Sequence, residues 1–256
     1  MLSIATWNIN SLRVRLAQLL TWLNKHQPDI MTLQETKVTD DQFPLEVFTQ
    51  LGYHTIYAGQ KTFNGVAILS REAPSDVMTD IAGLDDPQRR ILIASIGKIR
   101  VINLYVPNGA AVDSEKYIYK LNWLKQVTTH IKMELTQHSQ VVVLGDFNIA
   151  PADQDVHDPE KWRGNVLFSE PERLALQELL ACGLKDTFRL FEQAPASFSW
   201  WDYRAAAFRR NHGLRIDHIL ASEALAAKCQ LCQIDKAQRQ LERPSDHAPV
   251  VAEFLD

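Results

Sequence analysis

The chain has 256 residues, of which 46% are hydrophobic, and this composition is sufficient for a sizeable buried core. Its net charge of -4 argues against binding of polyanions through bulk charge, so any contact with nucleic acid must come from a local basic patch. Three cysteines are an odd number for a disulfide framework, and we expect all three to be reduced, in a cytoplasmic protein.

The chain lacks features of a membrane or modular protein. The N-terminal sequence MLSIATWNIN has no positive region followed by a long apolar stretch, and no window reaches the roughly 20 apolar residues of a membrane span. No Pro/Gly/Ser linker is long enough to separate two domains. We therefore expect one catalytic domain over residues 1–256, with no contact to membranes.

Short apolar runs that predict strands recur from the first residues to the last. In chain order they are LSIATWN, DIMTLQE, HTIYAG, GVAILS, RILIASI, IRVINLY, VVVLGD, RIDHILA and APVVAEF. Most of them are too apolar for a sheet with one face in water.

Three segments between these runs have helical patterns. Leucines recur at helical spacing over residues 12–23, and apolar residues do so over 118–135. In SEPERLALQELL, Ser169 and Glu172 form a capping-box pattern ahead of a third helix. Buried strands with a few one-sided helices predict an α/β protein, a four-layer α/β sandwich in which two packed mixed sheets are flanked by helices.

Several strand runs end in residues that a core would not choose. The strand-end residues are Asn8, Glu35, Tyr105, Asp146 with Asn148, and Asp217. If these ends share one rim of two stacked sheets, their side chains meet in one pocket. Carboxylates gathered in a pocket repel one another unless a cation lies among them, and oxygen ligands favour Mg²⁺ or Mn²⁺. The expected chemistry is attack of water on a phosphoryl group.

Each residue has a structural alternative when it is taken alone. Asn8 could end a strand, Glu35 could cap a helix, and Tyr105 could be a half-buried aromatic residue. In GDFN, Gly145 would allow a close approach of two chains, yet the same four residues could form an ordinary turn. Within PSDHAPV, Asp246 could be a turn residue and His247 a core histidine. Their combination in one chain favours a catalytic site.

With these residues identified, the chain resembles the exonuclease III family of DNA-repair nucleases, within the endonuclease/exonuclease/phosphatase superfamily. The resemblance spans nearly the whole chain. It depends on WNINSLR, LQETK, GQKTFNGVAILSR, NLYVPNG, GDFNIAP, FSWWDYR, GLRIDHIL and PSDHAPV. It implies a four-layer sandwich, dependence on Mg²⁺ or Mn²⁺, and cleavage of DNA phosphodiesters.

The resemblance also implies a role for each site residue. Glu35 would be the main metal ligand, with Asn8 and Asp246 near the ion or supporting its ligands. Asp146 would orient or deprotonate the attacking water. Asn148 would hold the scissile phosphate, which Tyr105 and Asn108 would contact from the other side, and Asp217 would pair with His247, which faces the phosphate. Trp200 would form the aromatic wall of the sugar pocket, whereas Trp201 and His218 are expected to be structural.

Basic residues near the motifs predict a surface for duplex DNA. One group is Arg204, Arg209, Arg210 and Arg215, and a second group is Arg13, Arg15, Lys61, Arg71, Lys116 and Lys120. Any one of them could be an ordinary surface charge. Together they could surround the pocket and neutralise several phosphates.

The sequence leaves the dominant activity open. We expect a 3′ to 5′ exonuclease with 3′-phosphatase activity on double-stranded DNA with 3′ ends, nicks or abasic sites, acting as a monomer without an obligate protein partner. Bulky residues in the segment 161–169 could limit entry of an abasic sugar. Incision at abasic sites, hydrolysis of a phospholipid or inositol phosphate, and a non-catalytic binding module remain as alternatives.

Overall fold

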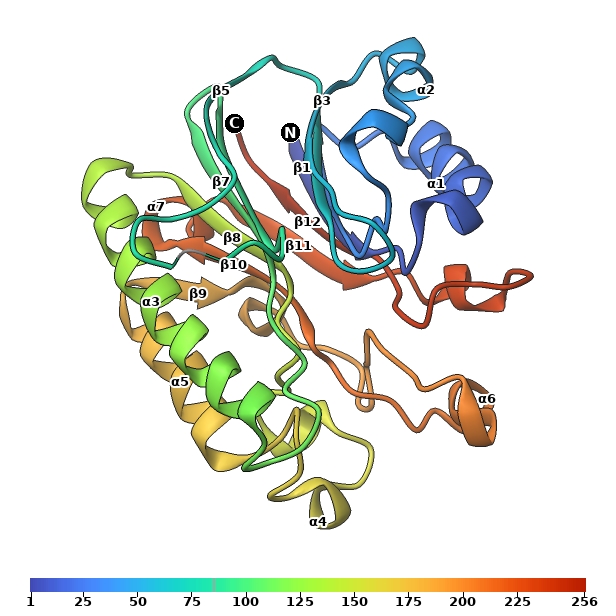
Figure 1. Cartoon of the computed structure of the whole chain (residues 1–256), viewed down its shortest axis with the longest axis vertical. Coiled ribbons are helices and arrows are strands. Elements are labelled where there is room, and N and C mark those ends of the chain that lie inside the picture. Colours follow the sequence, from blue (N-terminus) through green and yellow to red (C-terminus); the bar gives the residue numbers. More distant parts are fainter. Residues whose placement is uncertain (85) are drawn as a thin grey trace.

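The strands form two six-stranded sheets that pack face to face in this computed structural model, which describes residues 1–84 and 86–256 (Figure 1). The first sheet has the order β11 (Cys229–Ile234), β12 (Val250–Phe254), β1 (Leu2–Asn8), β2 (Ile30–Gln34), β4 (Val66–Ser70) and β3 (His54–Ala58). The second has the order β5 (Pro74–Met78), β6 (Ile91–Ile96), β7 (Ile99–Tyr105), β8 (Val141–Asp146), β10 (Asp217–Ser222) and β9 (Leu184–Asp186). Both sheets are mixed, because β1 runs parallel to β2 and β7 parallel to β8.

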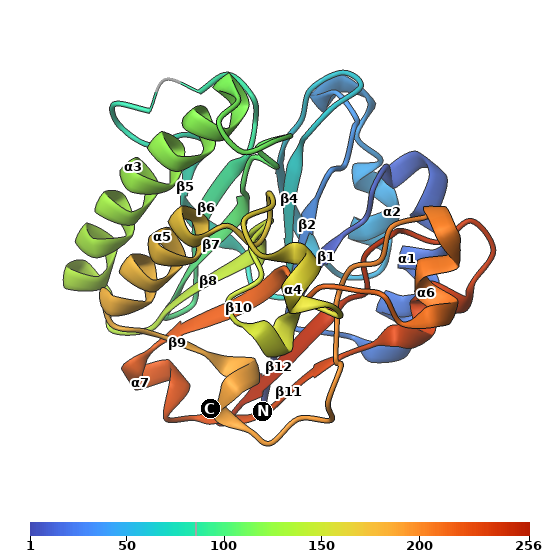
Figure 2. The ribbon, with the colours of Figure 1, turned by 90° about the horizontal axis from the view of Figure 1, so that it is seen from below.

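Helices cover the outer face of each sheet (Figure 2). The first sheet is covered by α1 (Leu12–His26) and α2 (Leu45–Gln50), and the second by α3 (Glu115–Gln137) and α5 (Glu170–Ala181). Short helices are α4 (Pro159–Trp162), α6 (Ala207–Arg210) and α7 (Glu223–Ala226), and 3₁₀ turns lie at Asp40–Gln42, Asp153–Asp155, Thr187–Leu190, Arg204–Ala206 and Lys236–Gln240. The predicted four-layer α/β sandwich and its three predicted helices are confirmed.

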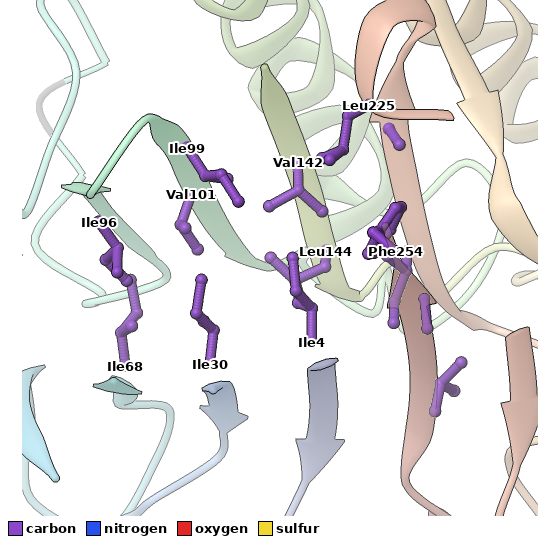
Figure 3. Packing of buried hydrophobic residues seen from close by; sticks show 14 of the residues in the cluster. Ile4, Ile30, Ile68, Ile96, Ile99, Val101, Val142, Leu144, Leu225 and Phe254 are labelled. Atoms are coloured by element: carbon purple, nitrogen blue, oxygen red, sulfur yellow. The ribbon is translucent and has the colours of Figure 1, made fainter. Parts of the chain in front are cut away.

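The main core lies between the two sheets (Figure 3). Ile4, Ile30 and Ile68 of the first sheet face Ile96, Val101 and Leu144 of the second. Separate apolar clusters fill the space between each sheet and its helices. Strands in the middle are thus covered on both faces. This explains why β7 and β8 are mostly apolar without alternation, with Arg100 and Asn103 as the polar residues inside β7, and why all residues of both strands are buried.

One buried polar residue links the sheets. The Asn103 side chain on β7 donates to the carbonyl oxygens of Leu33 and Ala67, both at 3.0 Å, and accepts from the Gln34 amide at 2.7 Å. These bonds connect β7 to β2 and β4 across the sandwich. They fix the relative position of the strand ends on which the polar residues lie.

The sequence patterns missed three strands and the shorter helices, and they misplaced one boundary. Strands β5, β9 and β11 and helices α2, α4, α6 and α7 were not predicted; β5 is a largely exposed edge strand, and β9 has only three residues. Asp217 begins β10, whereas we expected it at a strand end. The three cysteines are free, as expected. No helix within residues 1–84 and 86–256 has the length and apolar character to cross a membrane.

Candidate active site

Three neighbouring strands of the second sheet place polar side chains in one row. Tyr105 at the end of β7 pairs in register with Asp146 at the end of β8, and Asp146 pairs with Asp217 at the start of β10. Adjacent strands lie about 4.8 Å apart, so the three residues occupy one edge of the sheet. Asp217 reaches this edge because β10 runs antiparallel to β8.

An amide connects this row to the first sheet. Asn8 ends β1, and its Nδ2 donates both to Glu35 Oε1 and to Asp146 Oδ2, each at 2.9 Å. Glu35 directly follows β2, which lies beside β1 in parallel. Parallel neighbours end at the same edge, and the two sheets therefore contribute carboxylates to one site.

Glu35 is held in its charged form by its neighbours. Burial works against the charge, but the Lys37 ammonium at 2.8 Å from Oε2 and the Asn8 amide lower the pKa of Glu35 below its usual value. The Tyr105 hydroxyl donates to Oε1 at 2.8 Å. Burial and the adjacent carboxylates raise the pKa of Tyr105, so it remains a phenol that can donate. Glu35 has a φ of 53°, a strained conformation for this residue.

Asp146 lies beside His247 in a buried, strongly charged environment. Burial raises the pKa of Asp146 to about 7; the positive charge of His247 opposes this rise, and Asp217 adds to it. His247 Nε2 lies 3.7 Å from Asp146 Oδ2. This spacing is longer than a direct hydrogen bond, so Nε2 can donate to another group at the site.

Asp217 orients the imidazole of His247. Both oxygens of Asp217 lie near His247 Nδ1, at 2.9 and 3.1 Å. Burial lowers the pKa of His247, but the carboxylates of Asp217 and Asp146 together raise it to about 10. His247 is therefore an imidazolium at neutral pH, with Nδ1–H bonded to Asp217 and Nε2–H turned toward Asp146.

The turn after β8 brings two asparagines together. Asn148 has a φ of 50°, and its amide N–H donates to Asp146 Oδ1 at 2.9 Å. The Asn108 amide donates to Asn148 Oδ1 at 3.1 Å. Gly145 permits the turn, because a Cβ at this position would lie 2.0 Å from the carbonyl oxygen of Leu104. The close approach expected from GDFN is thus present.

Glu35 and Asp146 fit a divalent cation. One potential ligand atom from each of Glu35, Asp146 and His247 lies within 4.8 Å of the others. A protonated His247 has no free lone pair on Nε2, so the two carboxylates are the candidate ligands and the imidazolium lies beside them. Two of the donors are carboxylate oxygens, which suit a hard ion such as Mg²⁺. The Lys37 ammonium against Glu35 already shows that this carboxylate binds a positive charge.

Asp246 contacts Asn10 and Trp200 at the edge of the carboxylate site. Its Oδ1 accepts from Asn10 Nδ2 at 2.8 Å, and its Oδ2 accepts from the indole N–H of Trp200 at 3.0 Å. Asn10 also accepts from Lys37, at 2.6 Å. Asp246 thus lies beside the carboxylate site and fixes the indole of Trp200, the residue expected to form the wall of the sugar pocket.

A model of the endonuclease/exonuclease/phosphatase family matches residues 5–247 of the chain. The chain belongs to this family. It is 39% identical over 262 residues to a Haemophilus influenzae protein named exodeoxyribonuclease III, and the match covers 97% of this chain and 98% of that protein. Members of the family depend on a divalent metal, and the carboxylates of Glu35 and Asp146, beside His247, are a candidate site for it.

Two solved structures of this family superpose closely. One is the 3′ phosphatase NExo (D146N) from Neisseria bound to product DNA hairpin, with a TM-score of 0.98, 49% identity and coverage of 100% of both chains. The other is an AP endonuclease from Archaeoglobus fulgidus, with a TM-score of 0.95, 41% identity and coverage of 99% of both chains. The same fold therefore occurs in proteins described by different activities.

Three of the basic residues expected around the DNA are elsewhere. Arg215 is buried in ion pairs with Asp155 and Asp186, both at 2.7 Å, and Lys120 is fully buried. Arg71 packs over the Tyr53 ring with its guanidinium 3.9 Å from the ring centroid. For Arg215 and Lys120 the surface role was wrong, whereas Arg71 is partly exposed and follows β4 at the end opposite to Val66, which pairs with Gln34. In contrast, Arg13, Lys61, Lys116, Arg204, Arg209 and Arg210 are exposed, as a DNA-facing role requires.

Sequence reasoning did not single out Asn10 or Lys37, although both contact the carboxylate site. They lie inside the quoted motifs WNINSLR and LQETK, two residues beyond Asn8 and Glu35 respectively. The signal that could have identified them is their spacing, because each is a polar residue two positions after a predicted site residue. Trp201 and His218 are buried, and His218 Nε2 bonds the carbonyl of Ile149 at 2.9 Å, as structural residues would.

Proposed function

We propose that the chain is a divalent-metal-dependent DNA phosphodiesterase of base-excision repair, with 3′ to 5′ exonuclease and 3′-phosphatase activity. The observation that carries this proposal is the buried group of Glu35, Asp146 and His247, joined by Asn8 and completed by Asp217. The relative named exodeoxyribonuclease III and the 3′ phosphatase NExo bound to product DNA hairpin support DNA with a 3′ end as the substrate. We further propose a single catalytic domain and a cytoplasmic monomer that needs no protein partner.

Asp146 is the base in this proposal. Its raised pKa of about 7 suits a group that must accept a proton from water near neutral pH. Asn8 and the Asn148 backbone N–H hold its two oxygens in place, so the carboxylate is oriented before substrate arrives. A Mg²⁺ or Mn²⁺ ion on Glu35, with Asn8 and Asp246 supporting its surroundings, supplies positive charge that neutralises the phosphate.

His247 stabilises the charge that develops on the phosphate. Among the residues that the structure describes, Asp146 Oδ2 at 3.7 Å is the nearest acceptor recorded for its Nε2–H, and Asp217 keeps the ring charged and oriented. Asn148, Asn108 and Tyr105 donate from the opposite side in this proposal. Fixed donors and charges of this kind account for much of the rate enhancement in phosphoryl transfer.

Trp200 forms the wall of the pocket that receives the 3′-terminal sugar. It packs against an apolar cluster that includes Leu167, Phe168 and Leu214, and Asp246 fixes its N–H. Phe168 is fully buried and Leu167 nearly so, which leaves Val166 as the partly exposed member of this bulky group. Phe168 is therefore part of the core that supports the pocket.

Exposed cations around the site bind the DNA backbone. Lys116, Arg204 and Arg210 are exposed, as are Arg13 and Lys61. Arg204 forms a bonded pair with Asp202, and this pair reduces its free charge. Arg13 and Lys116 lie in the first turns of α1 and α3, Arg204 and Arg210 lie in the short helical turns at 204–210, and Lys61 lies in the loop between β3 and β4. In this proposal, these exposed cations allow a chain with an acidic total charge to bind DNA.

A second candidate is incision at abasic sites, which the Archaeoglobus fulgidus AP endonuclease at 41% identity favours. Three substrates distinguish the two activities: a 3′-recessed duplex, a nick with a 3′-phosphate, and a duplex with one abasic site. We expect one enzyme preparation with Mg²⁺ to process the first two faster in gel assays. Strong cleavage of the abasic duplex alone would make incision the main activity, and turnover of a phospholipid without DNA cleavage would contradict both.

A further inference from the structure

A charged pair is buried between the two helices that cover the second sheet. Lys120 on α3 and Glu172 on α5 are both fully buried, and Lys120 Nζ lies 2.5 Å from Glu172 Oε1. These helices lie side by side on the outer face of the sheet (Figure 2). Neither side chain reaches the solvent, so neither can contact DNA directly.

All three donors of the Lys120 ammonium are used, and two of them go to loops of the active site. Besides Glu172, the ammonium donates to the carbonyl oxygen of Asn148 at 2.7 Å and to that of Asn108 at 3.2 Å. An ammonium has three hydrogens and no acceptor, so this set is complete. Asn108 and Asn148 are the residues whose amides face the phosphate in the proposed mechanism. Lys120 therefore holds the backbone of both.

Glu172 connects the same pair to the loop beside the sugar pocket. Its Oε1 accepts from the amide of Leu167, and its Oε2 accepts from the amide of Ser169, both at 3.1 Å. The Ser169 hydroxyl also donates to Oε2, and Tyr117 of α3 bonds this hydroxyl at 2.6 Å. With Lys120, the carboxylate accepts four hydrogen bonds, which is about its full capacity.

Stability alone gives little reason for this arrangement. A buried ion pair contributes little more folding stability than well-packed apolar residues of similar size, because both charges must lose their hydration. Asn148 also has a φ of 50°, a conformation that its neighbours must maintain. The Asn148 carbonyl accepts from Lys120 and the Asn148 backbone N–H donates to Asp146, so the backbone of this residue is held on both sides of its Cα.

We propose that Lys120 and Glu172 are positioning residues of the active site, which fix Asn108, Asn148 and the 165–169 loop relative to one another. This inference rests on the proposed function, because the positioned groups are those that hold the phosphate and the sugar. Gly109 supports it: a Cβ there would lie 3.2 Å from Val166 and 3.3 Å from the Lys120 side chain, so the three segments are in close contact.

The test compares turnover with DNA binding in three variants. A displacement of about 1 Å in a positioned group can lower a rate by about 100-fold, so we expect Lys120→Met to reduce kcat by about 10- to 100-fold on a 3′-phosphate nick. Glu172→Gln should also reduce kcat. The Kd for the same DNA, measured by fluorescence anisotropy with Ca²⁺ in place of Mg²⁺, should change by less than about threefold, since both side chains are buried.

The double variant Lys120→Met/Glu172→Leu separates positioning from stability. Removing both charges eliminates the unpaired buried charge, so its urea midpoint should recover toward that of the wild type. Its kcat should stay as low as that of Lys120→Met, because the bonds to Asn108 and Asn148 are still absent. If Lys120→Met does not fold, the double variant and Glu172→Gln carry the test.

Glu134→Gln is the matched control. Glu134 lies on the same helix and forms a buried pair with Arg100 at the start of β7, about 17 Å along the strand from Tyr105. We expect this variant to lose stability and keep its kcat. Full turnover in Lys120→Met, or recovery of kcat in the double variant, would overturn the positioning role. Wild-type protein without metal-dependent DNA cleavage would instead refute the proposed function and remove this inference with it.

Discussion

Asp217→Asn tests whether His247 acts as a charged donor. The substitution keeps the size of the side chain and removes the negative charge 2.9 Å from His247 Nδ1. If the mechanism requires a protonated His247, the variant should lose activity at every pH at which the His247 ring is neutral. The His247→Ala protein should show the largest defect, at every pH.

The size of the effect follows from the geometry. Charges about 4 Å apart interact by about 4 kcal/mol at an effective dielectric constant near 20, which corresponds to about 3 pKa units. Asp217 and Asp146 together raise the pKa of His247 to about 10. Without Asp217, that pKa should fall to near neutrality. Removal of an oxyanion donor lowers kcat by about 100- to 1,000-fold, and we expect Asp217→Asn to approach this loss above neutral pH.

The assay is phosphate release from a 3′-phosphate nick between pH 6 and pH 9 at saturating Mg²⁺. Protonation of Asp146 below about pH 7 should lower the turnover of both proteins toward pH 6. The ratio of Asp217→Asn turnover to wild-type turnover should rise at pH 6, where the His247 ring of the variant regains its proton. Asp186→Asn is the control, because Asp186 is a carboxylate on neighbouring β9 that pairs with Arg215. Unchanged turnover in Asp217→Asn, or a uniform loss without pH dependence, would refute the reasoning.

Four other perturbations have definite expected results. Asp146→Asn should lose about 100- to 10,000-fold in kcat while its Kd for DNA remains near that of wild type, and an active variant would exclude Asp146 as the base. Trp200→Ala should raise KM by about 10-fold, since stacking of one base or sugar on an indole contributes roughly 1–3 kcal/mol; an unchanged KM would place the sugar elsewhere. Arg13→Ala should lower the slope of log Kd against log salt by about 0.9, which equilibrium titrations at several salt concentrations would reveal or contradict. Burial and Arg215 lower the pKa of His218, so the unfolded state binds more protons than the folded state, and the free energy of unfolding should decrease below about pH 6.5 by at most about 1.4 kcal/mol per pH unit. Urea titrations at several pH values should show a shallower dependence of this free energy on pH in His218→Gln than in wild type. An equal dependence in both proteins would argue against a neutral buried ring.

Much of the fold was readable in the sequence because burial on both faces leaves a strong signal. Strand β8 is a continuous apolar run that ends at Gly145 and Asp146, and β7 is apolar apart from Arg100 and Asn103. The capping pattern of Ser169 and Glu172 marked the start of α5. The missed strand β5 begins with Pro74 and is mostly exposed at the sheet edge, so it has no apolar run. Strand β9 is too short for a periodic pattern.

The candidate site was visible because polar residues interrupt apolar runs at strand ends. Its internal contacts were not visible, because they depend on register and on the orientation of loops. Nothing in the sequence shows that Asp246 bonds Trp200 instead of facing the carboxylates, or that Lys37 reaches back to Glu35.

The sequence also did not predict which charged residues are buried. Lys120 and Arg215 have the same charge as surface residues such as Lys116, and only the packing of α3 against α5 and the pairing of β10 with its neighbours place them inside. A cation within a helical pattern is usually on the surface. The partners that neutralise Lys120 and Arg215, Glu172 and Asp155, are about 50 to 60 residues away in the chain.

The most direct test of the central claim is metal-dependent cleavage of DNA by the purified chain. A duplex with a 3′-phosphate nick is incubated with wild type in EDTA, and then with Mg²⁺ added in excess of the chelator. We expect no phosphate release in EDTA and full release after addition of Mg²⁺, with Asp146→Asn inactive under both conditions. Release that persists in EDTA, or no cleavage of any DNA substrate with Mg²⁺ or Mn²⁺, would contradict the proposed function.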